Sequence, residues 1–100
     1  MQQFEWDAAK ARANERKHKV SFEEAASVFR NYWIQRPDAR KDYGETRFIA
    51  IGRDSNGVVL NVVCTLRDER IRIISVWKAS RHERKTYEKA VADRALQQPR

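Results

Sequence analysis

Residues 47–78 read RFIAIGRDSNGVVLNVVCTLRDERIRIISVWK, and this stretch decides the fold. Three runs rich in β-branched and other apolar residues lie at 47–53, 58–67 and 70–78. Such runs favour β-strands. Asn56-Gly57 is a strong hairpin signal between the first two runs, and Asp68-Glu69 provides a tight turn between the last two. Three consecutive strands joined by short turns predict an antiparallel meander.

Two helices are predicted before this stretch. Residues 7–17 are strong helix formers, and Asp7 places a negative charge where the helix dipole favours it. Ser21 followed three residues later by Glu24 has the pattern of a capping box, which begins a second short helix at 22–29. Phenylalanines and alanines at three- and four-residue spacing give this second helix one apolar stripe.

A further strand and a C-terminal helix complete the prediction. Residues 32–35 have strand propensity, but Pro37 indicates that this strand lies at an edge of the sheet. Ser80 and Glu83 form a second capping box at the start of a helix that runs to about Leu96. The apolar side of this helix, which we expect to face the sheet, consists of Tyr87, Ala90, Val91 and Leu96. The chain is therefore predicted to be an α+β sandwich: two N-terminal helices, an antiparallel three- to four-stranded sheet and a C-terminal helix, forming one domain over residues 1–100.

Composition narrows the function classes. The 100 residues contain 21 Lys and Arg against 14 Asp and Glu, a net charge of +7, which attracts polyanions such as RNA, DNA, an anionic membrane or an acidic protein. No apolar run is long enough to span a membrane, and the N-terminal residues lack the pattern of a signal peptide, so we expect a cytoplasmic protein. The single cysteine, Cys64, lies in an apolar run, where it is expected to pack as a small core residue.

The hairpin around Asp68-Glu69 predicts two different faces. A two-residue loop pairs Arg67 with Arg70, Thr65 with Arg72 and Leu60 with Trp77. One face then forms a core and carries Leu60, Val62, Cys64, Leu66, Ile71, Ile73 and Trp77. The other face carries Asn61, Thr65, Arg67, Arg70, Arg72 and Lys78.

Three arginines at the hairpin end of one face would repel one another unless an anion or a carboxylate lies among them. The pattern alone fits two interpretations equally well. One is an ordinary solvated strand face, and the other is a surface that binds phosphate groups.

Other residues could carry chemistry near this basic face. Glu83 lies one helical turn before Tyr87 on the same side of the C-terminal helix, and it is either a simple capping residue or a partner of Lys78 or an arginine. Tyr87 is either a packed aromatic residue or a substrate-binding one. His18 and His82 have no neighbouring histidine, cysteine or paired carboxylates at metal-ligand spacing, so no metal site and no cofactor are predicted.

Short segments along nearly the whole chain together have a specific order and spacing. They are Phe4-Glu5-Trp6-Asp7, Lys10, Asn14, Lys17-His18, residues 20–25, Val28-Phe29, residues 45–52, residues 70–75, Lys78-Ala79 and residues 83–88. In these segments the chain resembles the BrnT-type ribonuclease toxins of type II toxin-antitoxin systems, whose fold is distantly similar to that of the RelE toxins. The chain departs from the family at Lys19, where glycine is usual, and at Trp77, where arginine is frequent. Because the predicted register points Trp77 to the core, the loss of a charge there need not inactivate the enzyme. A degenerate toxin stays an alternative.

The resemblance implies metal-independent RNA cleavage and an antitoxin of the BrnA type, which binds the toxin in a hetero-oligomer and represses their shared promoter. DNA would then be bound only through the antitoxin. Two other classes stay open: a non-catalytic nucleic-acid-binding protein, and an interaction module for an acidic protein.

Cleavage without a metal uses the 2′-hydroxyl of RNA as the nucleophile, so the protein needs a base, an acid and cations for the charge of the transition state. We expect Arg67, Arg72 and Lys78 to stabilise that charge, Glu83 or His18 to transfer protons, and Tyr87 to orient or stack on the substrate. Glu83 is preferred over His18 because it is predicted to lie near Lys78. Further RNA contacts are expected from Arg47, Arg70 and Arg81.

Overall fold

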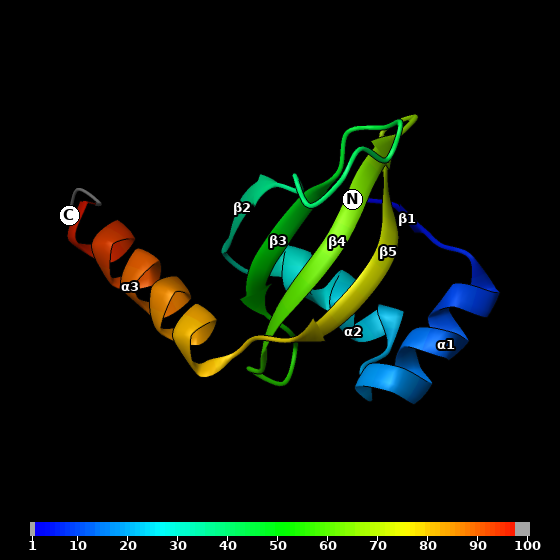
Figure 1. Ribbon diagram of the computed structural model, residues 1–100. Coiled ribbons are helices and arrows are strands. Elements are labelled where there is room, and N and C mark those ends of the chain that lie inside the picture. Colours follow the sequence, from blue (N-terminus) through cyan, green and yellow to red (C-terminus); the bar gives the residue numbers. More distant parts are fainter. Residues whose placement is uncertain (1, 98–100) are drawn as a thin grey trace.

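The computed structural model describes residues 2–97 and shows an α+β fold (Figure 1). The predicted single domain covers residues 1–100, of which Met1 and residues 98–100 lie outside the described part. The elements in chain order are β1 (Phe4–Glu5), α1 (Ala8–His18), α2 (Phe22–Ser27), the 3₁₀ helix η1 (Val28–Arg30), β2 (Trp33–Pro37), β3 (Phe48–Arg53), β4 (Val59–Arg67), β5 (Arg70–Lys78) and α3 (Arg81–Gln97).

The sheet has five strands in the order β1-β5-β4-β3-β2. The predicted meander of three strands is confirmed, and β2 extends it antiparallel to β3 at one edge. At the other edge, β1 pairs in parallel with β5, so the sheet is mixed rather than purely antiparallel. A two-residue strand is too short to produce a period-2 pattern, and its pairing depends wholly on the neighbouring β5.

The predicted turns and caps are present. Asp68 and Glu69 both have positive φ, 49° and 69°, which the tight two-residue turn of a hairpin requires. Ser21 and Glu24 form the predicted capping box of α2. In α1, a carboxylate oxygen of Asp7 accepts a hydrogen bond from the Lys10 amide at 3.2 Å.

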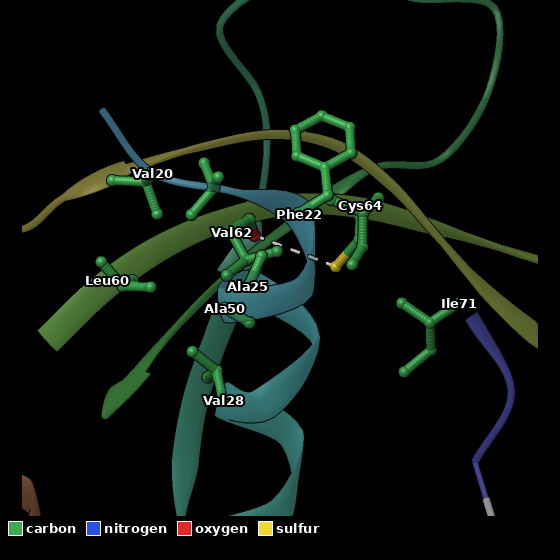
Figure 2. Packing of buried hydrophobic residues seen from close by; sticks show 11 residues of the cluster. Val20, Phe22, Ala25, Val28, Ala50, Leu60, Val62, Cys64 and Ile71 are labelled. Carbon is green, nitrogen blue, oxygen red and sulfur yellow. Dashed lines mark hydrogen bonds between the residues drawn. The ribbon is translucent and has the colours of Figure 1, made fainter. Parts of the chain in front are cut away.

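The main core lies between the sheet and the helices α1 and α2 (Figures 1 and 2). Phe22, Ala25 and Val28 of the α2–η1 segment pack on the buried face of the sheet. Gly52 allows this close approach, because a Cβ atom there would lie 2.9 Å from Val28 Cγ1 and 3.0 Å from the Tyr32 carbonyl oxygen. Cys64 is fully buried in this core, as expected, and burial raises the pKa of its thiol to about 12.

Asn14 of α1 completes the free edge of β5 where β1 no longer covers it. Its Nδ2 atom donates to the Val76 carbonyl at 2.9 Å, and its Oδ1 atom accepts from the Val76 amide at 3.1 Å. Oδ1 also accepts from the Ser75 hydroxyl, and Nδ2 donates to the Val20 carbonyl. One buried side chain therefore takes the place of a neighbouring strand and fixes α1 against the sheet.

A β-bulge in β5 changes the predicted faces. Arg67 pairs with Arg70 and Thr65 with Arg72 as predicted, but the register shifts between Val63 and Cys64. Ile74 is the extra residue, and beyond it every residue of β5 points to the face opposite to the predicted one.

The predicted core position of Trp77 was therefore wrong. Trp77 pairs with Asn61 rather than Leu60, and Val76 takes the fully buried core position instead. Lys78 pairs with Leu60, so its place in the register is on the face opposite to that of the arginines. Leu66, also predicted in the core, is 64% exposed because α1 and α2 do not extend to the hairpin end.

Helix α3 begins with the predicted capping box: the Ser80 amide donates to Glu83 Oε1 at 2.8 Å, and the Glu83 amide donates to Ser80 Oγ. The expectation that its whole apolar side faces the sheet was wrong. Tyr87 is buried, but Val91 and Leu96 are exposed, because α3 diverges from the sheet (Figure 1). Within residues 2–97, no helix has the length and apolar character needed to cross a membrane.

Candidate functional site

The face of the sheet opposite to α2, which we call the open face, holds the candidate site, and α1 lies along its β5 edge. Helix α3 covers it at one end only, where Tyr87 packs with Ile51 and Val59. The rest carries the residues that alternate with the core positions of β3, β4 and β5.

The hairpin end of the open face carries a network of arginines and carboxylates, which we call the basic end. Glu45 accepts hydrogen bonds from Arg47 at 3.2 Å and from Arg67 at 3.3 Å. Arg72 Nη1 donates to Glu5 Oε2 at 2.8 Å, across the parallel pairing of β5 with β1. The carboxylates therefore separate arginines that would otherwise repel one another.

In the described part of the chain, one of the four arginines of the basic end has no carboxylate within ion-pair distance. Arg70 donates instead to the neutral Gln3 side chain at 3.1 Å, while the carboxylates of Asp68 and Glu69 lie exposed in the adjoining turn. The two arginines beside Glu45 lower the pKa of that carboxyl. The Arg70 guanidinium and the unused N–H donors of the paired arginines favour an anionic ligand, whereas the ionised carboxylates oppose one.

A second group, the tryptophan cluster, lies at the β5 side of the open face and consists of His18, Trp77 and Arg40. The His18 ring, at the end of α1, is 6.2 Å from the Trp77 ring between centroids. The Arg40 guanidinium lies 5.5 Å from the centroid of the Trp77 ring. Arg40 is held there by two hydrogen bonds to Asp38, at 2.8 and 2.9 Å. A half-buried aromatic ring beside a cation is suited to stacking with a nucleobase.

A third feature, the Glu83 pocket, is a cavity of ≈ 320 Å³ between the first two turns of α3 and strands β2 and β3. It is lined by Ile34, Gln35, Arg36, Ile49, Ile51, His82, Glu83 and Thr86. Glu83 is held by α3 and by the sheet, since Asn61 Nδ2 of β4 donates to its Oε1 atom at 3.1 Å. The hydrogen bond from the Ser80 amide, with smaller contributions that include the charge of Arg36, lowers the pKa of the Glu83 carboxyl.

The structure separates several residues that the sequence analysis placed together. Glu83 contacts Asn61, whereas Arg72 lies opposite Thr65, four residues further along β4. This is about 13 Å at the usual rise of a strand. Lys78, whose expected nearness was the reason to prefer Glu83 for proton transfer, lies on the face of the sheet opposite to the arginines.

Tyr87 and Arg81 lie apart from the arginines of the sheet. Tyr87 is 2% exposed, and its hydroxyl donates to the Tyr32 carbonyl at 2.7 Å, which gives it a structural role. Arg81 is exposed at the start of α3. In the part of the chain that the structure describes, no three His, Cys, Asp or Glu side chains are grouped in a way that could hold a metal ion.

Sequence reasoning missed three charged residues of this face: Arg36, Arg40 and Glu45. Period-2 alternation from Ile34 could have placed Arg36 on the open face. Arg40 and Glu45 lie in the irregular segment between β2 and β3, for which no periodicity predicts a direction.

The sequence also matches a known protein family over most of its length. The family described as "Ribonuclease toxin, BrnT, of type II toxin-antitoxin system" matches residues 6–83. The chain belongs to the BrnT toxin family. Its members are ribonuclease toxins of type II toxin-antitoxin systems, as the resemblance predicted.

A solved relative agrees with the fold. The crystal structure of the Brucella abortus ribonuclease toxin BrnT matches with a TM-score of 0.63 and 21% sequence identity, over 81% of this chain and 100% of that one. A comparison with curated proteins finds no significant match. The family match ends at Glu83, so most of α3 lies beyond it.

Proposed function

We propose that this BrnT family member is a metal-independent endoribonuclease that binds RNA along the open face and thereby inhibits translation and growth. The observation that carries the proposal is the basic end, where Arg47, Arg67, Arg70 and Arg72 lie together on an uncovered sheet surface and Arg70 has only a neutral partner. A net charge of +7 brings polyanions to this surface.

The chemistry needed for RNA cleavage fits the residues of this face. Attack of the 2′-hydroxyl on the neighbouring phosphate produces a negatively charged phosphorane, which guanidinium groups stabilise. Arg72 and Arg67 are our candidates for this role. The carboxylates beside them already accept hydrogen bonds from arginines, so the arrangement serves an anionic phosphate better than a metal cation.

For proton transfer we propose His18 rather than Glu83. Histidine is the side chain suited to accept and donate protons near neutral pH. A carboxyl with a lowered pKa is a weak base and a poor acid at that pH, and Glu83 is of this kind. His18 lies beside Trp77, on which a base of the substrate could stack. It also lines a surface hollow with Ile74 and Ser75, two and three residues along β5 from Arg72.

Family membership also supports an antitoxin partner. We propose that a BrnA-type protein binds this chain in a hetero-oligomer, neutralises it in the cytoplasm and makes the contacts to promoter DNA. Co-expression of the chain with the adjacent reading frame should give a stable complex and restore growth. If no neighbouring frame encodes a protein that binds the chain and restores growth, the proposed partner is wrong.

The metal-independent cleavage is tested with purified protein and a short synthetic RNA. EDTA should leave the cleavage rate unchanged, and the products should carry 2′,3′-cyclic phosphate ends. A strict requirement for added magnesium or manganese would contradict the proposed chemistry. RNA that is bound but stays intact would instead favour the non-catalytic binding protein.

The role of the basic end is tested with two matched substitutions of one ion pair. Arg72→Gln and Glu5→Gln both break the 2.8 Å pair, but only the first removes a cation. For Arg72→Gln we expect cleavage to fall at least 100-fold and the slope of log K against log salt to decrease by about 0.7, which corresponds to one phosphate contact on single-stranded RNA. Glu5→Gln should retain or increase RNA affinity. Equal effects of the two substitutions would show that the pair is only structural.

A further inference from the structure

The Glu83 pocket lies about 13 Å from the basic end, so the contacts proposed above for the phosphate leave it unused. Three isoleucines of β2 and β3, Ile34, Ile49 and Ile51, provide apolar surface, whereas Glu83, His82 and Arg36 provide polar groups. A cavity of ≈ 320 Å³ with mostly apolar walls and a few convergent polar groups has the character of a small-ligand site.

The carboxylate of Glu83 is fixed with one oxygen available. Oε1 accepts from the Ser80 amide at 2.8 Å and from Asn61 Nδ2 at 3.1 Å. Within residues 2–97, Oε2 accepts no hydrogen bond from the protein. A carboxylate oxygen held in place by its neighbour is a preorganised acceptor for an N–H group.

Arg36 adds a donor to the same pocket. It lies two residues after Ile34 on β2, so both side chains belong to the open face. Its side chain lines the pocket together with Glu83, and its charge contributes to lowering the pKa of that carboxyl. The pocket thus combines an anionic acceptor with a cationic donor.

Guanine is the RNA base that best matches this pair of groups. Its N1–H and N2–H groups are adjacent donors for a carboxylate, and its O6 and N7 atoms accept from arginine. Adenine and cytosine present a single amino group beside an unprotonated ring nitrogen, and uracil presents one N–H between two carbonyls. Both arrangements place an acceptor next to the carboxylate, which is repulsive.

We propose that the Glu83 pocket binds a guanine base of the RNA, with Glu83 Oε2 accepting from its N–H groups, Arg36 donating to its acceptor edge and the isoleucines contacting its ring. This specificity site rests on the proposed binding of RNA along the open face. It assigns Glu83 to recognition of a base.

Binding of free nucleotides tests the pocket without relying on cleavage. The full chain is titrated with GMP, IMP and AMP, and binding is followed by calorimetry and by NMR shifts of pocket residues. Inosine lacks only the N2 amino group of guanine. We expect IMP to bind about tenfold more weakly than GMP, the usual effect of losing one hydrogen bond to a charged group, and AMP more weakly still.

Three variants locate the site. In Glu83→Gln the amide oxygen stays with the Ser80 amide, so an N–H₂ donor replaces Oε2 and should abolish the preference for GMP. Thr86→Phe, at an exposed position that lines the pocket, should fill the cavity and reduce GMP affinity at least tenfold. Ala92→Phe places the same ring on an exposed position of the same helix outside the pocket and should bind GMP like the parent chain.

Equal affinity for the three nucleotides, or equal affinities of the Thr86→Phe and Ala92→Phe variants for GMP, would overturn the guanine site. RNA cleavage without guanine selectivity would reject the site and leave the ribonuclease proposal intact. Guanine-selective binding at Glu83 by a chain that cuts no RNA would support the guanine site and reject the ribonuclease proposal.

Discussion

At the scale of single residues, Lys19 shows the cost of a side chain at a left-handed backbone position. It ends α1 with φ 61° and ψ 30°, the left-handed region, and its amide donates to the Glu15 carbonyl as a helix C-cap. A Cβ atom makes this conformation costly, and glycine avoids that cost. Because Lys19 is exposed, its side chain bears on the stability of the helix end and leaves the open face unchanged.

We expect Lys19→Gly to stabilise the protein by about 0.5–1 kcal/mol, since it relieves the left-handed strain while the C-cap hydrogen bond is retained. Chemical denaturation measures the change. Lys17→Gly is the matched control: it lies inside α1, where glycine should cost about 1 kcal/mol. If both substitutions change the free energy of unfolding in the same direction, relief of left-handed strain at Lys19 is not the cause.

At the scale of elements, the bulge in β5 decides which side chains reach the open face. The predicted register is correct from Arg70 to Ile73 and fails from Ile74 onward, because one extra residue inverts the alternation. As a consequence Trp77 lies on the open face. Arg40 places a guanidinium beside its ring, so this part of the face keeps a positive charge.

Trp77→Ala should therefore affect function more than stability. Trp77 is only partly buried, so we expect a loss of about 1–2 kcal/mol, against about 2–5 kcal/mol for Ile73→Ala in the core of the same strand. RNA affinity should fall about tenfold for Trp77→Ala through the loss of stacking. Denaturation curves and RNA titration of the two variants check this. Full RNA affinity of the tryptophan variant would remove Trp77 from the proposed RNA path.

At the scale of the whole molecule, the segment between β2 and β3 ties the sheet edge to the open face. The Asp38 amide donates to the Arg47 carbonyl at 2.9 Å, and the Asp38 side chain is buried against Arg40. The hydrogen bonds from Arg40 lower the pKa of the Asp38 carboxyl to about 2. A polar loop in the sequence thus becomes an ordered part of the candidate site.

This pair predicts how stability depends on pH. The pKa of Asp38 is lower in the folded state than its ordinary value of 3.8, so its contribution is fully present above about pH 4 and is lost as the pH falls towards 2. Asp38→Asn should lower the free energy of unfolding at pH 7 and flatten its dependence between pH 4 and 2. Urea denaturation across that range measures both effects. An unchanged pH dependence in the variant would show that the Asp38–Arg40 pair does not stabilise the fold.

Local signals in the sequence determined most of the secondary structure of this protein. Each depends on neighbours in the chain: the capping boxes at Ser21 and Ser80, the turn at Asp68-Glu69, and the alternation that gives the meander. The order of the matched segments also indicated the family. The cluster of arginines at the basic end was predictable because the register is fixed by the two-residue turn and stays regular until the bulge at Ile74.

Contacts between distant segments determined the features of the candidate site that no local pattern predicted. The bulge at Ile74 depends on how β5 fits both β4 and Asn14 of α1, so no local pattern reports it. The pairing of Glu5 with Arg72 requires a two-residue strand that exists only beside β5. The Glu83 pocket is formed where α3 diverges from β2 and β3, and that angle is set by the packing of Tyr87 against the open face. The sequence thus identified the residue types of the proposed RNA-binding face, whereas tertiary packing determined which of them meet, because side-chain direction depends on register and on partners far along the chain.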